Sequence, residues 1–190
     1  MPHFRKRSME ELERKSDLAY SASNKFPLVL VLDGIRSLNN VGSIFRTADA
    51  FSLQSIVLCG VTGTPPHREI QKTALGATES VDWEYTEDIV SKLTELKSNG
   101  FCIVAIEQTH HSTPLEQGLT ARQLPIALIL GNEISGVSDA ALQLCDHVLE
   151  IPQFGSKHSL NVAVSAGIVI WELVANQLKS DGAATHPAAG

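Results

Sequence analysis

The chain has 190 residues, of which 43% are hydrophobic, and its formal net charge at pH 7 is −6. That length predicts one domain with a single hydrophobic core, and the acidic balance argues against a protein that binds nucleic acid over its whole surface. The three cysteines, Cys59, Cys102 and Cys145, lie far apart without CxxC spacing. They predict buried, reduced thiols and therefore a reducing compartment.

No targeting or membrane-spanning segment is expected. The first fifteen residues, MPHFRKRSMEELERK, are charged and lack the apolar stretch of a secretory signal. The longest apolar stretch, 162–175, contains Glu172 and is expected to be too short to cross a bilayer. We therefore expect a cytoplasmic protein without a membrane partner.

Residues 1–26 predict a basic arm ahead of the folded domain. Ser8 and Glu11 fit the capping box of one short helix, expected over 8–19. The domain itself is expected over 27–179, and the small and polar residues of 180–190 predict a flexible tail.

From residue 27 onward, apolar strand-like runs alternate with helical segments. Strands are expected at 28–33, 55–60, 81–85, 101–107, 125–131 and 147–152, and helices at 41–51, 68–76, 86–98, 139–144 and 159–178. Thr86 and Ser159 are expected to cap two of these helices. Apolar strands separated by helices predict an α/β fold with a mostly parallel sheet covered on both faces. Ligands of such sheets bind outside the carboxyl ends of the strands.

The first segment at a strand end is LDGIRSLNNVGSIFRTADAF. Asn40 lies in the loop before the helix, where the ordinary interpretation of an Asn is an N-cap. Arg46 lies within the helix, between Phe45 and Thr47. Because its neighbours are largely apolar, we expect the charge of Arg46 to be paired or to sit in a cleft.

The second and third segments follow later strands. In IALILGNEISGVSDAAL a strand ends at Gly131, where a ligand can approach the backbone closely, and Glu133 is placed for contacts in the crevice. In EIPQFGSKHSLNVAVSAGIVIWEL, Asn161 is expected one residue inside the first turn of the last helix. That helix is apolar on nearly every side, which predicts that it is buried all round and forms a subunit interface.

In this order, the three segments resemble the three motifs of the SpoU (TrmH-like) family of SPOUT methyltransferases. The motifs read Asn40-x-Gly42-x-x-x-Arg46, Leu130-Gly131-Asn132-Glu133-x-x-Gly136 and Ile151-Pro152-x-x-Gly155-x-x-x-Ser159-Leu160-Asn161. Each motif alone is weak, whereas the three together are specific. The resemblance covers residues 28–178.

The resemblance implies a C-terminal trefoil knot within the α/β fold, S-adenosylmethionine as cofactor, and a homodimer. The matching cofactor-binding positions are Ile106, Glu107, Gly131, Ile151, Gln153, Ser159 and Leu160. The implied reaction transfers a methyl group to a ribose 2′-hydroxyl of RNA. Methyl transfer from a sulfonium needs no metal, and the adjacent His110-His111 pair lacks metal-ligand spacing, so no metal is expected.

By resemblance, Arg46 is the central catalytic residue and reaches the cofactor site of the partner subunit. The family assigns Arg46 the role of base, but a guanidinium resists deprotonation. We instead expect Arg46 to bind a flanking phosphate bidentately and to stabilise the developing alkoxide. Asn40, Glu133 and Asn161 would then fix Arg46 and the ribose.

Four basic residues near strand ends are expected to contact RNA: Arg36, Arg68, Lys72 and Lys157. If about five phosphates are contacted, the logarithm of the affinity should fall with the logarithm of the salt concentration with a slope of about −3 to −5. We favour tRNA over ribosomal RNA as the substrate.

The sequence argues against two other classes of function. A Rossmann-type oxidoreductase or methyltransferase needs a GxGxxG-like turn after the first strand, where this chain has Gly34-Ile35-Arg36-Ser37-Leu38. A non-catalytic RNA-binding module on the same fold would have no reason to keep Asn40, Arg46, Glu133 and Asn161. Both alternatives are therefore disfavoured.

Overall fold

The computed structural model describes residues 5–8, 25–118, 123–157 and 159–180. The helix expected over 8–19 and the tail expected over 180–190 lie outside the described residues, apart from Ser8 and Ser180.

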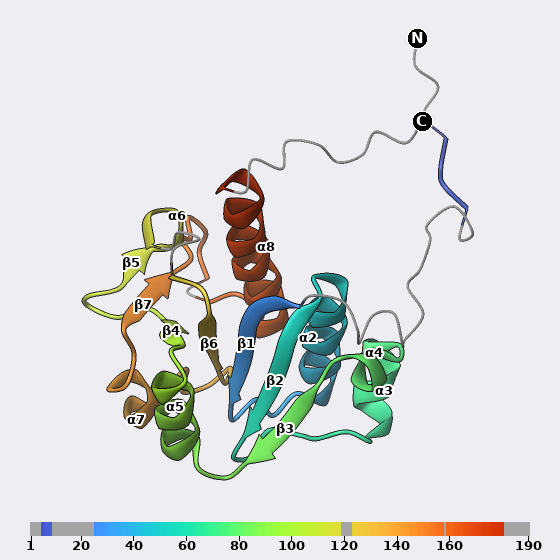
Figure 1. Cartoon of the computed structure of the whole chain (residues 1–190), viewed down its shortest axis with the longest axis horizontal. Coiled ribbons are helices and arrows are strands. Elements are labelled where there is room, and N and C mark those ends of the chain that lie inside the picture. Colours follow the sequence, from blue (N-terminus) through green and yellow to red (C-terminus); the bar gives the residue numbers. More distant parts are fainter. Residues whose placement is uncertain (1–4, 9–24, 119–122, 158, 181–190) are drawn as a thin grey trace.

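Seven strands form one sheet in the order β3-β2-β1-β6-β4-β7-β5, with β3 and β5 at its two edges (Figure 1). The strands are β1 (Phe26–Asp33), β2 (Leu53–Cys59), β3 (Trp83–Thr86), β4 (Cys102–Ile106), β5 (Thr113–Pro114), β6 (Ile126–Gly131) and β7 (His147–Glu150). All strand pairs of the described residues are parallel. The expected α/β class is confirmed, and the sheet is parallel throughout this part of the chain.

Helices cover both faces of the sheet (Figure 1). One face carries α2 (Leu38–Ala50), α3 (Arg68–Ala74), α4 (Ala77–Ser80) and α8 (Val162–Ser180), and the other carries α5 (Ile89–Ser98) and α7 (Asp139–Leu142). The short α6 (Leu115–Gly118) lies beside β5 and β7. Helix α2 packs against both α3 and α8, so it holds the first face together.

The alternation of β1 shows why this strand is apolar throughout. Leu28, Leu30 and Leu32 enter the core beneath α2 and α8, whereas Val29 and Val31 enter the core beneath α5 and α7. All five side chains are at most 2% exposed. Each contributes about 1.5–3 kcal/mol by leaving water, so the centre of the sheet gives its strand ends a rigid support.

Three helix starts differ from the sequence-based expectation. Helix α2 begins at Leu38 after the N-cap Ser37, whose hydroxyl accepts a hydrogen bond from Asn40 N, so the N-cap interpretation of Asn40 is wrong. Asp88 caps α5 in place of Thr86. Its charge suits the positive end of the helix better than a hydroxyl does.

The elements β5, α4 and α6 were not expected, because segments of two to four residues leave no periodic pattern.

The last helix, α8, begins at Val162 rather than at Ser159, and Asn161 is its cap. The Asn161 side-chain oxygen accepts hydrogen bonds from Ala163 N at 3.0 Å and from Val164 N at 3.3 Å. An amide oxygen in this position satisfies helix N–H groups that otherwise have no partner. Asn161 therefore precedes the helix instead of lying within its first turn.

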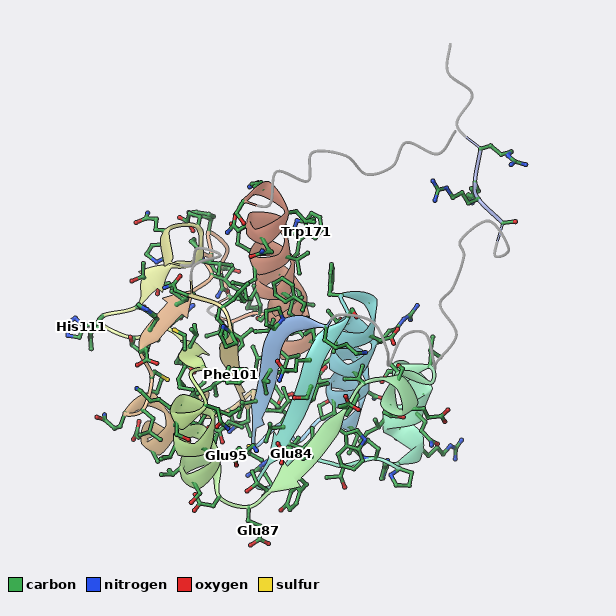
Figure 2. All side chains as sticks on the ribbon, viewed as in Figure 1. Glu84, Glu87, Glu95, Phe101, His111 and Trp171 are labelled. Atoms are coloured by element: carbon green, nitrogen blue, oxygen red, sulfur yellow. The ribbon has the colours of Figure 1, made fainter. Side chains whose placement is uncertain are left out.

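Only one side of α8 is buried in the chain, so the expectation that it is buried all round is wrong for a single copy. Val162, Ala166, Val169, Ile170 and Leu173 pack in the core. An apolar stripe on the opposite side is exposed, formed by Val164, Ile168, Trp171 and Leu178. Figure 2 shows Trp171 on this helix, where its ring centroid lies 6.1 Å from that of Phe51.

The length of α8 also corrects an expectation. With 19 residues, the helix is long and apolar enough to cross a membrane, judged by length and composition alone. Its buried side belongs to the sheet core, as it does in core helices of globular proteins.

The three cysteines are free thiols, as expected, but only Cys59 is buried, whereas Cys102 and Cys145 are partly exposed. Burial raises the pKa of Cys59 to about 12 and that of Cys145 to about 11, and it also raises the pKa of Cys102. Neutral thiols of this kind are poor nucleophiles, so they serve as packing groups.

Candidate active site

A cavity of about 530 Å³ opens where β4, β6 and β7 end and α8 begins. All seven residues predicted to contact a cofactor line it: Ile106, Glu107, Gly131, Ile151, Gln153, Ser159 and Leu160. These residues come from three separate strand ends, which the parallel sheet brings to one edge. The position agrees with the general placement of ligands in open α/β sheets.

The turn after β6 is built around Asn132. Its side-chain oxygen accepts hydrogen bonds from Ile134 N and Ser135 N, both at 2.9 Å, and its amide nitrogen donates to Ser135 Oγ at 2.7 Å. Gly131 has no space for a Cβ, because the backbone of Gly136 and Val137 occupies it. The turn is therefore fixed in shape before any ligand binds.

Two carboxylates hold the end of this turn against the sheet. Glu107 accepts hydrogen bonds from Val137 N and from Gln108 N, each at 2.9 Å, and Asp33 accepts one from Ser138 N at 2.8 Å. No role was expected for Asp33, and Asn132 was expected only as a member of the second motif. The signal that could have found them is their place, directly at the ends of β1 and β6.

Three of the four predicted catalytic residues form one hydrogen-bonded chain at the cavity. Asn40 donates to Glu133 Oε1 at 2.6 Å, and Asn161 donates to Asn40 Oδ1 at 3.1 Å. Glu133 and Asn161 line the cavity, while Asn40 joins them from the first turn of α2. Residues that lie 93 and 121 positions apart in the chain thus meet at one site.

Arg46 is not part of this chain of hydrogen bonds. Its side chain is exposed on α2 and does not line the cavity. Among the residues that the structure describes, none makes a hydrogen bond or ion pair with its guanidinium. The expectation that its charge is paired or sits in a cleft is therefore wrong within one chain.

The four predicted RNA-binding residues are all exposed. Arg36 lies in the loop between β1 and α2, Arg68 opens α3, and Lys157 lies between the cavity residues Gln153 and Ser159. Lys72 is 70% exposed and lies 3.8 Å from Glu69. In the described part of the chain, no group of three or more His, Cys, Asp or Glu side chains could hold a metal ion.

The family model of the SpoU rRNA Methylase family matches residues 27–171. The chain belongs to the SpoU family. It is 34% identical over 148 residues to the 23S rRNA (guanosine-2′-O-)-methyltransferase RlmB of Neisseria meningitidis, a match that covers 77% of this chain and 57% of the relative. The RlmB of Vibrio parahaemolyticus is 33% identical over 83% of this chain and 62% of its own length. The chain thus spans less than two thirds of these relatives.

Two solved structures of RNA-modifying enzymes share the fold. The TrmH/SpoU tRNA modifying enzyme of A. aeolicus superposes with a TM-score of 0.76 at 26% identity, over 90% of this chain and 85% of that one. An AdoMet-bound rRNA methyltransferase from Sinorhizobium meliloti superposes with a TM-score of 0.73, also at 26% identity, over 79% of this chain and 56% of that one. The resemblance found in the three motifs is confirmed.

Proposed function

We propose that this chain uses S-adenosylmethionine to methylate a ribose 2′-hydroxyl of RNA, and that it does so as a homodimer in the cytoplasm. The observation that carries the proposal is the hydrogen-bonded chain Glu133–Asn40–Asn161 beside the 530 Å³ cavity, in a chain that belongs to the SpoU family. SpoU relatives are named as RNA 2′-O-methyltransferases.

The cavity suits S-adenosylmethionine in size and chemistry. Small-molecule sites typically enclose about 300–1,000 Å³, and this cavity falls within that range. Ile106, Ile151 and Leu160 offer apolar surface for the adenine ring, and both Glu107 oxygens keep a free lone pair for hydroxyl groups of the cofactor ribose. A Sinorhizobium meliloti neighbour of this fold binds AdoMet. When bound, this cofactor supplies an electrophilic methyl group.

The protein's own task is to make the RNA hydroxyl nucleophilic. A ribose hydroxyl is a very weak acid, so the site must accept its proton or stabilise the charge that develops on its oxygen. Arg46 stabilises that charge and binds the flanking phosphate with its planar fork of donors. Asn40, Glu133 and Asn161 hold the ribose in position, because their side chains are already fixed by one another.

A homodimer explains the exposure of both α8 and Arg46. The stripe of Val164, Ile168, Trp171 and Leu178 is an apolar surface of the kind that subunit interfaces bury. Arg46 does not reach the cavity of its own chain, so it is available to the cavity of a second copy.

The trefoil knot also belongs to this proposal. The segment 151–161, which carries Ile151, Gln153, Ser159 and Leu160, would pass through a loop before α8 begins. Support comes from the family match over 27–171 and from the TM-score of 0.76 to a SpoU structure. If the chain is pulled at its two ends until it unfolds, a remaining knot should make its end-to-end length shorter than that of a fully extended chain, which is about 3.3–3.6 Å per residue.

We propose tRNA as the substrate, with ribosomal RNA as the alternative. The A. aeolicus neighbour, which this chain covers over 85% of its length, is named a tRNA modifying enzyme. Sequence relatives that this chain covers over 57% and 62% of their length are named 23S rRNA methyltransferases. The structural similarity to the A. aeolicus neighbour supports tRNA, whereas the sequence identity to the 23S rRNA methyltransferases supports ribosomal RNA.

A methyl-transfer assay tests the proposal. The purified chain is incubated with radiolabelled S-adenosylmethionine and with either total tRNA or ribosomal RNA, and the 2′-O-methylated positions are then mapped with and without the protein. We expect label in the tRNA fraction at a ribose oxygen. Label only in ribosomal RNA would select the alternative substrate. Cofactor and RNA binding without any transfer would instead identify a non-catalytic RNA-binding module.

A further inference from the structure

A second cavity, of about 420 Å³, opens at the carboxyl end of β2 and along the edge strand β3. It is lined by the loop 60–64 and by two aromatic side chains of the edge strand, Trp83 and Tyr85. None of these lining residues carries a charge. The proposed methyl transfer assigns no role to this cavity.

The two cavities flank the same loop. A Cβ placed on Gly34, directly after β1, would lie 3.6 Å from Asn132 Nδ2 and 3.7 Å from Val61 Cγ2. Asn132 lines the first cavity and Val61 lines the second. A molecule that extends across the strand ends from the first cavity therefore reaches the second.

The two aromatic rings lie on one face of β3. Trp83 is 36% exposed and Tyr85 46%, and the alternation of the strand places both on the same side. Glu84, between them, faces the other side, where it lies 2.7 Å from Lys92 Nζ, next to Glu95 of α5 (Figure 2). The Tyr85 hydroxyl donates to Gly60 O at 3.1 Å, which fixes its ring against the loop.

The loop beneath these rings is anchored to the loop before α2. The buried Thr62 hydroxyl accepts a hydrogen bond from Ile35 N and donates one to Leu32 O, both at 3.0 Å. The exposed Arg36 follows Ile35, and the exposed Arg68 follows the same loop at the start of α3. Two exposed arginines thus follow the backbone segments that support this uncharged aromatic surface. Glu87 lies beyond the end of β3 and points away from the domain (Figure 2).

We infer that Val61, Trp83 and Tyr85 form a stacking shelf for an unpaired nucleobase of the RNA, with Arg36 and Arg68 on its flanking phosphates. Proteins recognise unpaired RNA by stacking its bases on aromatic side chains and by placing basic side chains along its backbone. The inference rests on the proposed function for its ligand class, and it adds that the RNA is single-stranded near the target nucleotide.

Binding of a fluorescein-labelled single-stranded oligoadenylate, followed by anisotropy, tests the shelf. Trp83→Leu and Tyr85→Leu should each weaken binding by roughly 5- to 100-fold, the range expected when one base–aromatic stack is lost. Trp83→Phe and Tyr85→Phe should stay within a few-fold of the unmodified chain, because they keep a ring. Val90→Ala is the matched control, since Val90 is an exposed apolar residue on α5, at the other face of the sheet. Equal affinity in the Leu variants would overturn the inference.

The salt dependence of binding distinguishes the contribution of the stacking shelf from that of the two arginines. Arg36→Ala and Arg68→Ala should each reduce the slope of log Kd against log salt by about 0.7, because each releases one single-strand phosphate contact. The Leu variants should weaken binding without changing that slope. A change of slope in the Leu variants would contradict stacking.

Tryptophan fluorescence gives a direct readout that does not depend on activity. A base stacked on Trp83 quenches its emission, so the oligoadenylate should quench the unmodified chain, and Trp83→Phe should lose this quenching while keeping its affinity. Quenching that persists unchanged in Trp83→Phe would place the base elsewhere. If quenching occurs but no RNA is methylated by the unmodified chain, the proposed function fails and the shelf stands. If RNA is methylated without quenching, the shelf fails alone.

Discussion

At the scale of single residues, Asn161 serves both the last helix and the candidate site. Its oxygen caps α8 through Ala163 N and Val164 N, and its nitrogen donates to Asn40. Asn40 in turn donates to Glu133. Each amide can satisfy both of its neighbours in one orientation only, so the carboxylate of Glu133 sets the direction of the whole chain of hydrogen bonds.

The variant Asn161→Asp should keep the capping role of Asn161 and remove its role in the hydrogen-bonded chain of the site. Aspartate caps a helix as well as asparagine does, so the melting temperature should be maintained. A carboxylate cannot donate to Asn40, and turning the Asn40 amide around would set its oxygen against Glu133. Asn40 can then keep its bond to the introduced carboxylate only by losing its bond to the charged Glu133 carboxylate. A hydrogen bond to a charged group is worth about 1.5–3 kcal/mol, so kcat/KM should fall roughly 10- to 100-fold. Asn161→Ala is the control, and it should also lower stability by about 1 kcal/mol.

Arg46→Ala should abolish methyl transfer while cofactor binding, measured by calorimetry, survives, because the residues predicted to contact the cofactor line the cavity and Arg46 is not one of them. Arg46→Lys should restore little, because a point charge cannot reproduce bidentate binding of a phosphate. Substantial turnover by Arg46→Lys would show that the fork of donors is not needed.

Much of the candidate site could be predicted from the sequence, because the residues that follow predicted parallel strands are expected to meet at one edge of the sheet. All seven predicted cofactor positions line one cavity. The role of Asp33 and the hydrogen bonds of Asn132 were not predicted, because most of their partners are backbone N–H groups of a turn, which no side-chain pattern reveals. The exposure of Arg46 was missed because a single helix pattern cannot show which face a neighbouring helix leaves uncovered.

At the scale of elements, strands were predictable where apolar runs were long. The expected strand 28–33 lies within β1 and the expected strand 125–131 contains β6. Helix starts were less predictable, since Ser37, Asp88 and Asn161 each competed with another plausible cap within three residues. Tertiary contacts decide such cases, and Asn161 also bonds to Asn40 of α2.

Away from the site, Asp146 connects three elements of the fold. It lies 2.6 Å from Lys97 Nζ of α5, and it accepts a hydrogen bond from Ile103 N of β4 at 2.9 Å, just before β7 begins. Partial burial alone would raise the pKa of Asp146, but the hydrogen bonds from Lys97 and Ile103 outweigh burial and hold the pKa below its ordinary value.

The lowered pKa of Asp146 gives stability a defined pH dependence. Asp146 stabilises the fold above the ordinary aspartate pKa of about 3.9, and this contribution is lost as the pH falls through the lower pKa of the folded state. Asp146→Asn should therefore reduce the melting temperature at neutral pH and have progressively less effect as the solution is acidified. A difference that grows on acidification would contradict the ion pair.

At the scale of the whole molecule, the α/β class and the parallel sheet followed from the alternation of apolar strands and helices. The order β3-β2-β1-β6-β4-β7-β5 did not, because many orders of parallel strands bury the same residues. The second cavity was missed for a similar reason. Trp83 and Tyr85 belong to an expected strand, and only the sheet order shows that this strand is at an edge.

The exposed stripe of α8 predicts the assembly. Ile168→Glu should yield monomers by light scattering, because a charge cannot be buried in an apolar interface without a partner. Val90→Glu is the matched control, since Val90 and Ile168 are each 38% exposed. A dimer that persists in Ile168→Glu would place the interface elsewhere.

Mixing two inactive variants tests whether the site is shared. Arg46→Ala lacks the proposed charge stabiliser, and Asn40→Asp disrupts the chain of hydrogen bonds beside the cavity. If one subunit's arginine serves the other's cavity, mixed dimers contain one intact site, so methyl transfer should reappear on mixing. Two variants that stay inactive together would place Arg46 and Asn40 at the same cavity.

The bonds from Asn40 to Glu133 and Asn161 have a consequence for biosynthesis. Asn40 is translated before its two partners, which lie 93 and 121 residues further along the chain. A nascent chain that is interrupted before the last helix can pair its central strands, but it lacks the final wall of the cavity and the amide that orients Asn40. The hydrogen-bonded chain Glu133–Asn40–Asn161 can therefore form only after the segment that carries Asn161 has been translated.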